Sequence, residues 1–228
     1  MSLQKRFNSV TNRINHACQS RLDSDSALSQ VKLLAVSKKQ SLEKIQALYA
    51  LGQRKFGESY LQEALVKIQK LNDLSIQWHF IGPIQSNKSK HIAANFHWVQ
   101  SVASLKILQR LNRHRPKEMP PLNVLLQLKV GDEASKKGLS AEQLLELCRQ
   151  HRDYTHIKIR GLMAIPPPSD EFDVQLFQFQ QCHKLYTQMQ KIISVDTLSI
   201  GMSNDLEAAI AAGSTMVRVG SDLFGARQ

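Results

Sequence analysis

The chain has 228 residues, of which 42% are hydrophobic and 21% are charged, which is the balance of an ordinary soluble globular protein. Its formal net charge is +11, with 30 basic and 19 acidic residues. The basic residues are spread along the whole chain and the densest clusters, 88–91 and 113–117, are short, so the charge favours small anionic ligands over specific nucleic-acid binding.

Hydrophobic periodicity and turn residues divide the chain into alternating elements. A polar segment with spaced apolar residues predicts a helix at 4–22, before the first buried strand. The predicted elements that follow are, in chain order, a strand at 31–37, a helix at 41–52, a strand at 55–59, a helix at 60–71, a strand at 76–82, a short helix within 86–95, a strand at 96–102, a helix at 104–112, a strand at 122–130, a helix that opens at Ser140 with capping-box spacing, a strand at 156–165, a helix at 172–193, a strand at 197–201, a helix at 205–213 and a strand at 215–220.

Eight strands that alternate with helices predict a parallel sheet. Eight is also the number that closes a (β/α)8 barrel, so we expect a single TIM-type barrel with an extra N-terminal helix, forming one domain over residues 1–228. An open doubly wound sheet is the alternative, but no GxGxxG follows the first strand.

Barrel active sites lie at the carboxyl ends of the strands, and phosphate often binds between the loops after strands seven and eight. The first strand ends at Lys38, and the last two loops place glycine beside serine, with Gly201 near Ser203 and Gly220 before Ser221. Glycine admits backbone N–H groups to a phosphate, and serine adds a hydroxyl donor. Two ordinary turns would look the same singly, but their pairing in adjacent loops favours a phosphate cup.

A charged residue within the apolar strand TMVRVG, Arg218, needs a partner. It either forms an ion pair inside the barrel or donates to a ligand ring nitrogen or carboxylate. Partial desolvation near other cations would lower the pKa of Lys38 and allow it to form a Schiff base. These are the parts that pyridoxal 5′-phosphate needs. A Schiff-base aldolase acting on a phosphorylated sugar would need similar parts.

Other classes of site and location have little support. Three distant cysteines without CxxC spacing predict neither a disulfide framework nor a zinc site, and fit a reducing cytoplasm. The eight histidines lack paired ligand spacing, so we expect no metal. The N-terminus has no signal-peptide core, and no apolar run approaches the roughly 20 residues of a membrane span, so no membrane association is expected.

Four motifs carry a family resemblance: AVSK (35–38), HFIGPIQSNK (79–88), RGLMAI (160–165) and the long C-terminal run over 199–227. Together they resemble the pyridoxal-phosphate homeostasis protein family, from about residue 5 to the C-terminus. That family is a single barrel, similar to the N-terminal domain of alanine racemase. The resemblance implies that Lys38 binds pyridoxal 5′-phosphate covalently as an imine.

The resemblance also implies roles for residues near that lysine. Arg218 would face the pyridine nitrogen, leave it unprotonated and so weaken the cofactor as an electron sink. Met163 and His79 would line the mouth, and Met202 would help hold the phosphate through its backbone. Lys39 is expected to be a solvated neighbour. The cofactor-binding residues implied are Lys38, Ser59, His79, Met163, Ser199, Met202, Ser203, Arg218, Gly220 and Ser221.

Some positions depart from the family pattern. Ser59 stands where asparagine is common, and it reaches less far. Ser221 replaces a usual threonine and keeps the hydroxyl. Lys129 stands where the family often has asparagine, and would either raise anion affinity or compete electrostatically with imine formation. Lys136 matches a family lysine whose role is open.

The main hypothesis is a non-catalytic carrier that holds pyridoxal phosphate, maintains its intracellular level and could deliver it to apo-enzymes. The alternative is an amino-acid racemase, which needs a tyrosine from a second domain as the opposing acid or base. The chain ends shortly after the eighth strand, at Gln228, so that domain is not expected. A third hypothesis, nucleic-acid binding, rests on charge alone, and the resemblance suggests a monomer.

Overall fold

The computed structural model describes residues 1–20, 31–131 and 138–225. Within them, eight parallel strands pair in chain order and β8 pairs with β1, which closes a barrel. The predicted TIM-type barrel is therefore confirmed, and the open doubly wound sheet is excluded. The strands are β1 (Lys32–Val36), β2 (Lys55–Glu58), β3 (Gln77–Phe80), β4 (Trp98–Val102), β5 (Leu122–Gln127), β6 (Ile157–Met163), β7 (Thr197–Ser199) and β8 (Met216–Val219).

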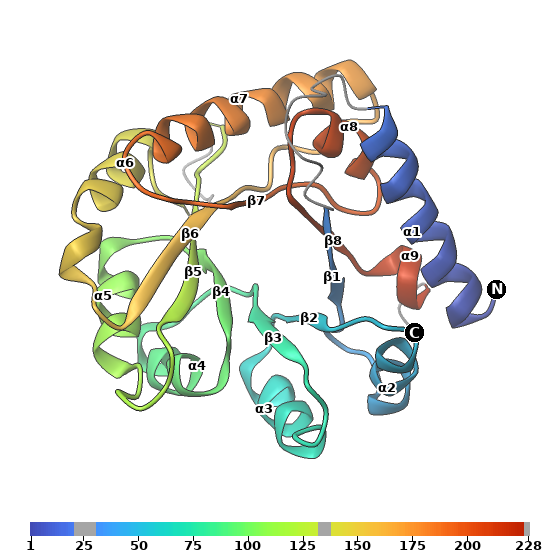
Figure 1. Ribbon diagram of the computed structural model, residues 1–228, viewed down its shortest axis with the longest axis horizontal. Helices are drawn as coiled ribbons and strands as arrows, with labels where there is room; N and C mark the ends of the chain where they lie inside the picture. Colours follow the sequence, from blue (N-terminus) through green and yellow to red (C-terminus); the bar gives the residue numbers. More distant parts are fainter. Residues whose placement is uncertain (21–30, 132–137, 226–228) are drawn as a thin grey trace.

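The helices surround the strands in chain order, as Figure 1 shows. The predicted helices are present within the described residues, and a short η2 and a short α9 were not predicted. The helices are α1 (Leu3–Gln19), α2 (Leu42–Ala50), α3 (Leu61–Lys70), the 3-10 helix η1 (Ser86–Lys88), α4 (Ser89–Asn95), α5 (Leu105–His114), α6 (Ala141–Arg149), the 3-10 helix η2 (His151–Asp153), α7 (Phe172–Gln190), α8 (Leu206–Ala211) and α9 (Ser221–Phe224).

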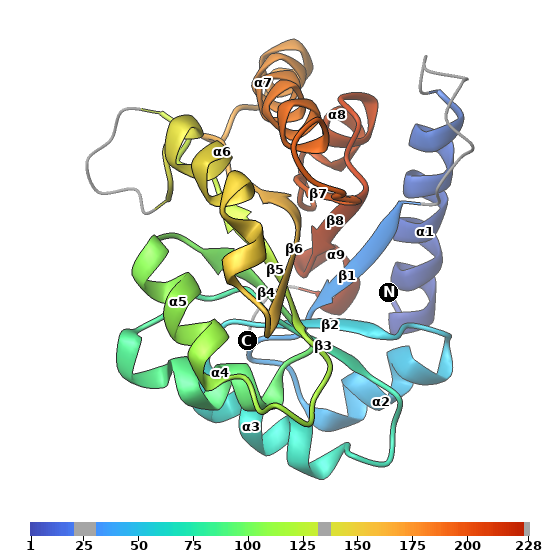
Figure 2. The same ribbon diagram turned by 60° about the vertical axis from the view of Figure 1, so that its left-hand side comes forward.

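The N-terminal helix α1 lies outside the βα repeats. The Ser2 side chain caps it by accepting from the Lys5 backbone N–H at 3.3 Å. Val10, Ile14 and Ala17 share one face at helical spacing and are buried. That face packs α1 against α8 and α9 (Figures 1 and 2).

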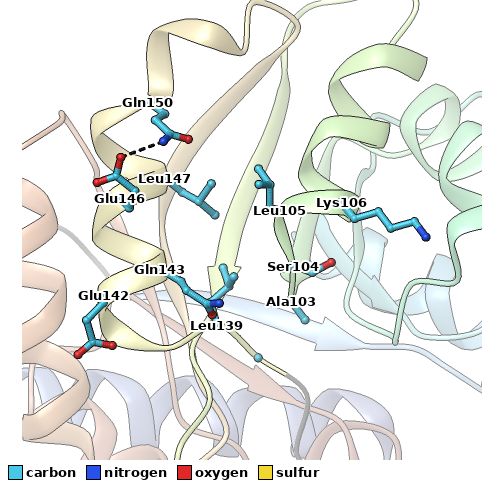
Figure 3. Close-up of a pocket in the computed structure, with 11 residues that line it drawn as sticks. Ala103, Ser104, Leu105, Lys106, Leu139, Glu142, Gln143, Glu146, Leu147 and Gln150 are labelled. Carbon is cyan, nitrogen blue, oxygen red and sulfur yellow. Dashed lines mark hydrogen bonds between the residues drawn. The ribbon is translucent and has the colours of Figure 1, made fainter.

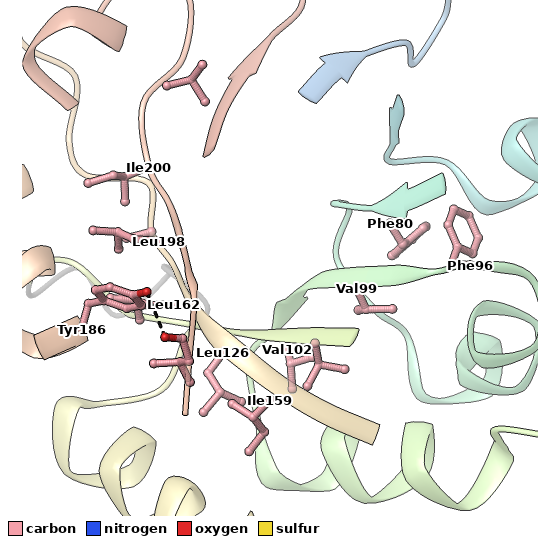
Figure 4. Close-up of a cluster of buried hydrophobic side chains, with 14 of the residues drawn as sticks. Phe80, Phe96, Val99, Val102, Leu126, Ile159, Leu162, Tyr186, Leu198 and Ile200 are labelled. Atoms are coloured by element: carbon pink, nitrogen blue, oxygen red, sulfur yellow. Dashed lines mark hydrogen bonds between the residues drawn. The ribbon is translucent and has the colours of Figure 1, made fainter. Parts of the chain in front are cut away.

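The main core lies between the strands and the helices. In Figure 4, Val99 of β4, Leu126 of β5 and Leu162 of β6 belong to one buried cluster, together with Tyr186 of α7. The Tyr186 hydroxyl donates to the Val195 carbonyl at 3.3 Å, so the only polar atom of that side chain is satisfied. Because the strands are covered by helices outside and by side chains inside, they read as nearly continuous apolar runs.

The barrel interior is a second, smaller core. Trp98, Leu125 and Met163 pack there as a separate apolar cluster. Gly161 lets β6 approach β7, because its φ is +143° and a Cβ atom would lie 1.9 Å from the Thr197 carbonyl oxygen. Among the described helices, none is long and apolar enough to cross a membrane.

Candidate functional site

A cavity of about 490 Å³ opens at the carboxyl ends of the strands. It is lined by residues of β1, β6 and β8, by the segments that follow β1, β2, β3, β6, β7 and β8, and by Gln175 of α7. Most of the predicted site residues meet there although they come from five separate strand ends. Those that line the cavity are Lys38, Ser59, Met163, Met202, Ser203, Arg218, Gly220 and Ser221.

Lys38 is placed in the cavity by a tight turn after β1. The Ser37 backbone N–H donates to the Gly57 carbonyl at 2.9 Å, and the Gln40 N–H donates back to the Ser37 carbonyl at 3.0 Å. Lys39 has a positive φ of 61° and is exposed, with its N–H donating to Glu63 at 2.6 Å. The turn therefore separates the two lysines, with Lys38 at the cavity and Lys39 in solvent, as predicted for Lys39.

A buried ionic cluster lies behind this turn. The Lys67 ammonium on α3 donates to Glu58 Oε1 at 2.8 Å, to Glu63 Oε1 at 2.5 Å and to the Ser37 carbonyl at 2.7 Å. The Ser37 hydroxyl also donates to Glu58 Oε1 at 2.6 Å. Burial raises the pKa of Glu58, and the nearby Lys67 charge opposes that rise. The cluster braces the backbone that presents Lys38.

Ser59 follows β2 and faces the cavity from beside Lys38. The loop after β3 passes directly against it, because Gly82 has no side chain: a Cβ atom there would lie 2.1 Å from the Ser59 carbonyl oxygen. Ser101 of β4 donates to the Gly82 carbonyl at 2.5 Å and holds this approach in place. Backbone packing thus sets the position of Ser59.

Arg218 projects from β8 into the cavity floor and is 5% exposed. Its guanidinium donates to the Ser199 carbonyl at 2.6 Å, to the Ser199 hydroxyl at 2.9 Å and to the Ala164 carbonyl at 3.1 Å. Burial lowers the pKa of Arg218 to about 10, so it stays a cation at neutral pH. The sequence predicted either an ion pair or a bound ligand for Arg218. In the structure, the oxygen atoms of Ser199 and Ala164 hold the guanidinium in place.

The two predicted phosphate loops meet at their serines. The Ser221 hydroxyl donates to the Ser203 hydroxyl at 3.1 Å, across the gap between the β7 and β8 loops. Gly201 turns the first loop with a φ of +91°, and a Cβ atom there would lie 2.5 Å from the Ala209 Cβ. Asp205 closes the loop by accepting from the Met202 N–H at 2.6 Å. Both hydroxyls therefore lie at one side of the cavity.

His79 and Ser199 do not line this cavity, and the expectation that His79 lines the mouth is wrong. Both side chains are fully buried in the layer beneath it. His79 stacks on Trp98 at 5.2 Å between ring centroids, and the Gln100 amide N–H donates to its Nδ1 at 3.0 Å. The Ser199 hydroxyl donates to Gln100 Oε1 at 2.7 Å and accepts from Arg218. They support the floor instead of facing the ligand space.

Burial lowers the pKa of His79 well below its usual range, with the charges of Lys55, His97 and Lys32 adding to the effect. The imidazole is therefore neutral at neutral pH. Because Gln100 donates to Nδ1, the ring hydrogen is assigned to Nε2, which has no hydrogen-bond partner among the described residues. Gln100 was not singled out from the sequence, although a glutamine inside the apolar strand WVQSV was the available signal.

The loop after β6 contributes residues to the cavity that were not singled out from the sequence. Pro166, Pro168, Ser169 and Asp170 line the cavity, together with Gln175 of α7. The Gln175 amide donates to the Ser169 carbonyl at 2.6 Å and so ties the loop to the helix. The signal that could have found them was their position just beyond a strand end.

A second cavity of about 550 Å³ adjoins the first and shares Ile81, Met163 and Ile165 with it. Lys129 lines this second cavity and is its only charged lining residue among those described, whereas it does not line the Lys38 cavity. Lys136, the other lysine noted in the sequence, lies outside the described residues.

A third cavity of about 670 Å³ lies between α5 and α6 (Figure 3). Leu105 and Leu147 face each other across it, and the Gln150 amide donates to Glu146 at 2.8 Å on its rim. It shares no lining residue with the Lys38 cavity. No group of three or more His, Cys, Asp or Glu side chains in the described part of the chain is placed to hold a metal ion.

The Lys38 cavity thus combines a primary amine, two adjacent hydroxyls and a buried guanidinium. Hydroxyl and backbone N–H donors suit an oxyanion, and a fixed cation suits a ring nitrogen or carboxylate. An amine that shares the cavity with them can condense with a carbonyl group. This set of donors fits a small phosphorylated aldehyde.

Known proteins that are similar to this chain include pyridoxal phosphate homeostasis proteins. The family model for the alanine racemase N-terminal domain matches residues 17–228. A pyridoxal phosphate homeostasis protein of Pasteurella multocida is 44% identical over 232 residues, covering 100% of this chain and 98% of that protein. A protein of the same name from Pseudomonas aeruginosa is 51% identical, covering 86% of this chain and 85% of its own length.

Solved structures share the barrel. The structure of PipY from Synechococcus elongatus with PLP bound matches with a TM-score of 0.82 and 32% identity, covering 98% of this chain and 100% of that chain. An alanine racemase from Corynebacterium glutamicum matches with a TM-score of 0.67 and 16% identity, covering 97% of this chain and 61% of that chain. At that identity the second likeness shows the fold alone.

Proposed function

The chain belongs to the family of pyridoxal phosphate homeostasis proteins, and from that premise we propose that it binds pyridoxal 5′-phosphate in the Lys38 cavity and takes part in vitamin B6 homeostasis. One observation carries the proposal: Lys38, the hydroxyl pair of Ser203 and Ser221, and the buried Arg218 line the same cavity. These groups come from three strand ends, those of β1, β7 and β8, so their convergence is a property of the closed barrel.

The residues present fit the cofactor. Ser203 and Ser221 would hold the phosphate with Gly220 beside them, Lys38 would carry the aldehyde as an imine, and Arg218 would face the ring nitrogen. Met163 supplies apolar surface at the cavity wall. When bound, the cofactor supplies an electrophilic aldehyde and a conjugated ring.

The proposed role is that of a carrier rather than a catalyst. A cation at the ring nitrogen disfavours its protonation, which weakens the ring as an electron sink. A racemase also needs an acid or base on each face of the substrate carbon. Among the described residues that line the Lys38 cavity there is no tyrosine, and Tyr60 is half-exposed at the start of α3. We therefore favour reversible storage of the cofactor over turnover.

Storage would matter because a free aldehyde reacts with amines elsewhere. An imine to a protein lysine keeps the aldehyde masked, and hydrolysis or exchange with another amine releases it. Apo-enzymes that need the cofactor are the natural recipients. We place this exchange in the cytoplasm and propose a monomer as the working unit.

The test is borohydride reduction of the purified protein loaded with pyridoxal 5′-phosphate, followed by peptide mapping. We expect a yellow protein that is bleached by borohydride, with the pyridoxyl group fixed on Lys38. Lys38→Ala should lose the colour, whereas the matched Lys39→Ala variant, next in sequence but exposed, should keep it. A label found mainly on Lys39 or Lys129 would overturn the assignment.

A further inference from the structure

Helix α1 stands outside the barrel and contributes no residue to the lining of the Lys38 cavity, yet one of its side chains reaches the two loops behind that cavity. Helix α1 packs against α8 and α9 (Figure 1), and the Arg13 side chain bonds to Glu207 of α8 and Asp222 of α9. Its guanidinium contacts residues that are 190 to 209 positions away in sequence. The arrangement links the N-terminal helix to the loops that hold Ser203 and Ser221.

The contacts use most of the guanidinium. Its Nε donates to Glu207 Oε1 at 2.7 Å and its Nη2 donates to Glu207 Oε2 at 3.0 Å, a bidentate pair. Its Nη1 donates to Asp222 Oδ2 at 2.5 Å, and Nη2 also donates to the Ser203 carbonyl at 2.8 Å. The Arg13 side chain therefore joins α8, α9 and the backbone carbonyl of Ser203, one of the two serines proposed to bind the phosphate.

The charges around the cup give this link an electrostatic role. Asp222 directly follows Ser221, and Glu207 lies in the first turn of α8. Two carboxylates this close to an anion site would repel a phosphate. The hydrogen bond that Arg13 donates to Glu207 raises the pKa of Arg13, against the effect of burial, so the guanidinium stays charged beside both acids. A fixed cation between the carboxylates offsets that repulsion.

We propose that Arg13 is a positioning residue for the phosphate group, and that it holds the Ser203 backbone and neutralises Glu207 and Asp222 without touching the ligand. This inference rests on the proposed binding of pyridoxal 5′-phosphate. Its signature is selectivity: losing Arg13 weakens binding of the phosphorylated aldehyde and leaves the unphosphorylated one largely unchanged. A purely structural role of α1 would weaken both ligands together.

The experiment is absorbance titration of the full chain with pyridoxal 5′-phosphate and, separately, with pyridoxal. The variants are Arg13→Ala, Arg13→Lys and Lys5→Ala, the last a matched control that removes an exposed cation from the same helix. Arg13→Ala should weaken the phosphorylated ligand about tenfold, since it removes hydrogen bonds to charged groups, and change pyridoxal less than about twofold. Lys5→Ala should match wild type for both ligands.

Arg13→Lys keeps the charge but cannot reproduce the planar fork. It should fall between wild type and Arg13→Ala, and it carries the test if Arg13→Ala does not fold. The proposal is overturned if these variants lose affinity for both ligands equally, or if they bind the phosphorylated ligand as tightly as Lys5→Ala does. If wild type binds neither ligand as an imine, the proposed function itself falls, and the inference falls with it.

Discussion

The side-chain Nζ of Lys67 lies 2.7 Å from the carbonyl oxygen of Ser37, so a buried ammonium on α3 holds the residue that immediately precedes Lys38. The same ammonium pairs with Glu58 at 2.8 Å. Lys67 is 5% exposed and Glu58 is fully buried, so neither charge is solvated. The presentation of Lys38 therefore depends on an ion pair in the protein interior.

Removing one partner of that pair should destabilise the protein strongly. Lys67→Met leaves the Glu58 carboxylate buried and unpaired, and we expect the free energy of unfolding to fall by about 3–5 kcal/mol. Denaturant unfolding measures it, with Lys70→Met, an exposed lysine of the same helix, as the control. Adding Glu58→Leu to Lys67→Met should recover part of the loss. A Lys67→Met protein as stable as the Lys70→Met control would show that the pair contributes nothing.

Acid should destabilise the fold through His79. Its pKa is well below the usual range when folded, so below about pH 6.5 the unfolded chain takes up a proton that the folded ring refuses. The unfolded state then binds more protons, and stability falls as pH drops, by up to about 1.4 kcal/mol per pH unit from this group. Above about pH 6.5 the histidine is neutral in the unfolded chain as well, so this group no longer makes the free energy of unfolding depend on pH.

The measurement is the free energy of unfolding between pH 5 and pH 8 (about the range in which histidine titrates). His79→Gln should have a shallower slope on the acid side than wild type, whatever its absolute stability. His91→Gln, which changes an exposed histidine, is the control and should keep the wild-type slope. Identical slopes for all three proteins would remove His79 as the source.

Loss of the hydroxyl pair should weaken phosphate binding without removing the imine. Ser203→Ala and Ser221→Ala should each cost about 1.5–3 kcal/mol of binding free energy for pyridoxal 5′-phosphate, the range of hydrogen bonds to charged groups. The yellow colour should persist at saturating ligand. Pyridoxal, which lacks the phosphate, is the ligand control and should bind the variants like wild type. Undiminished affinity in the double variant would mean that the phosphate binds elsewhere.

Lys129 should have little influence on the cofactor. It lines the adjoining cavity and not the one that Lys38 lines, so its charge is not a direct ligand group. Lys129→Asn, which restores the common family residue, should change the affinity for pyridoxal 5′-phosphate by less than about threefold, or about 0.7 kcal/mol. The same titration measures it. A larger change in either direction would place Lys129 in the cofactor site.

Catalytic turnover of amino acids should be negligible. Loaded protein in deuterated water should exchange its imine with L-alanine but should not exchange the α-proton. No tyrosine lines the cavity among the described residues to act as the opposing acid or base, and a cation at the ring nitrogen would weaken the ring as an electron sink. Mass spectrometry and chiral chromatography detect both deuterium and racemisation. Exchange at roughly 1 per second or faster that disappears in Lys38→Ala would restore the racemase hypothesis.

Hydrophobic periodicity along the chain determines much of the fold. Strand and helix patterns alternate, and eight strands with covered faces close into a barrel. The same pattern points to Lys38, Ser203 and Ser221, because the carboxyl ends of parallel strands meet at one end of a barrel. It overestimates the length of the fifth strand, which ends at Gln127 rather than at 130. Beyond Gln127, Leu128 forms an isolated β-bridge with Leu139.

Sequence alone therefore determined which residues stand at the strand ends, because strand ends are visible as local patterns. Only the tertiary structure decided which side chains face the cavity and which lie below it. His79 and Ser199 occupy the layer under the floor, and Arg13 of α1 and Lys67 of α3 bond to backbone carbonyls behind the cavity. The physical reason is that closure of the barrel and helix packing bring together side chains that are far apart in the sequence, and so determine which groups form hydrogen bonds. Arg13 and Ser203 are 190 residues apart, and no local pattern records that distance in space.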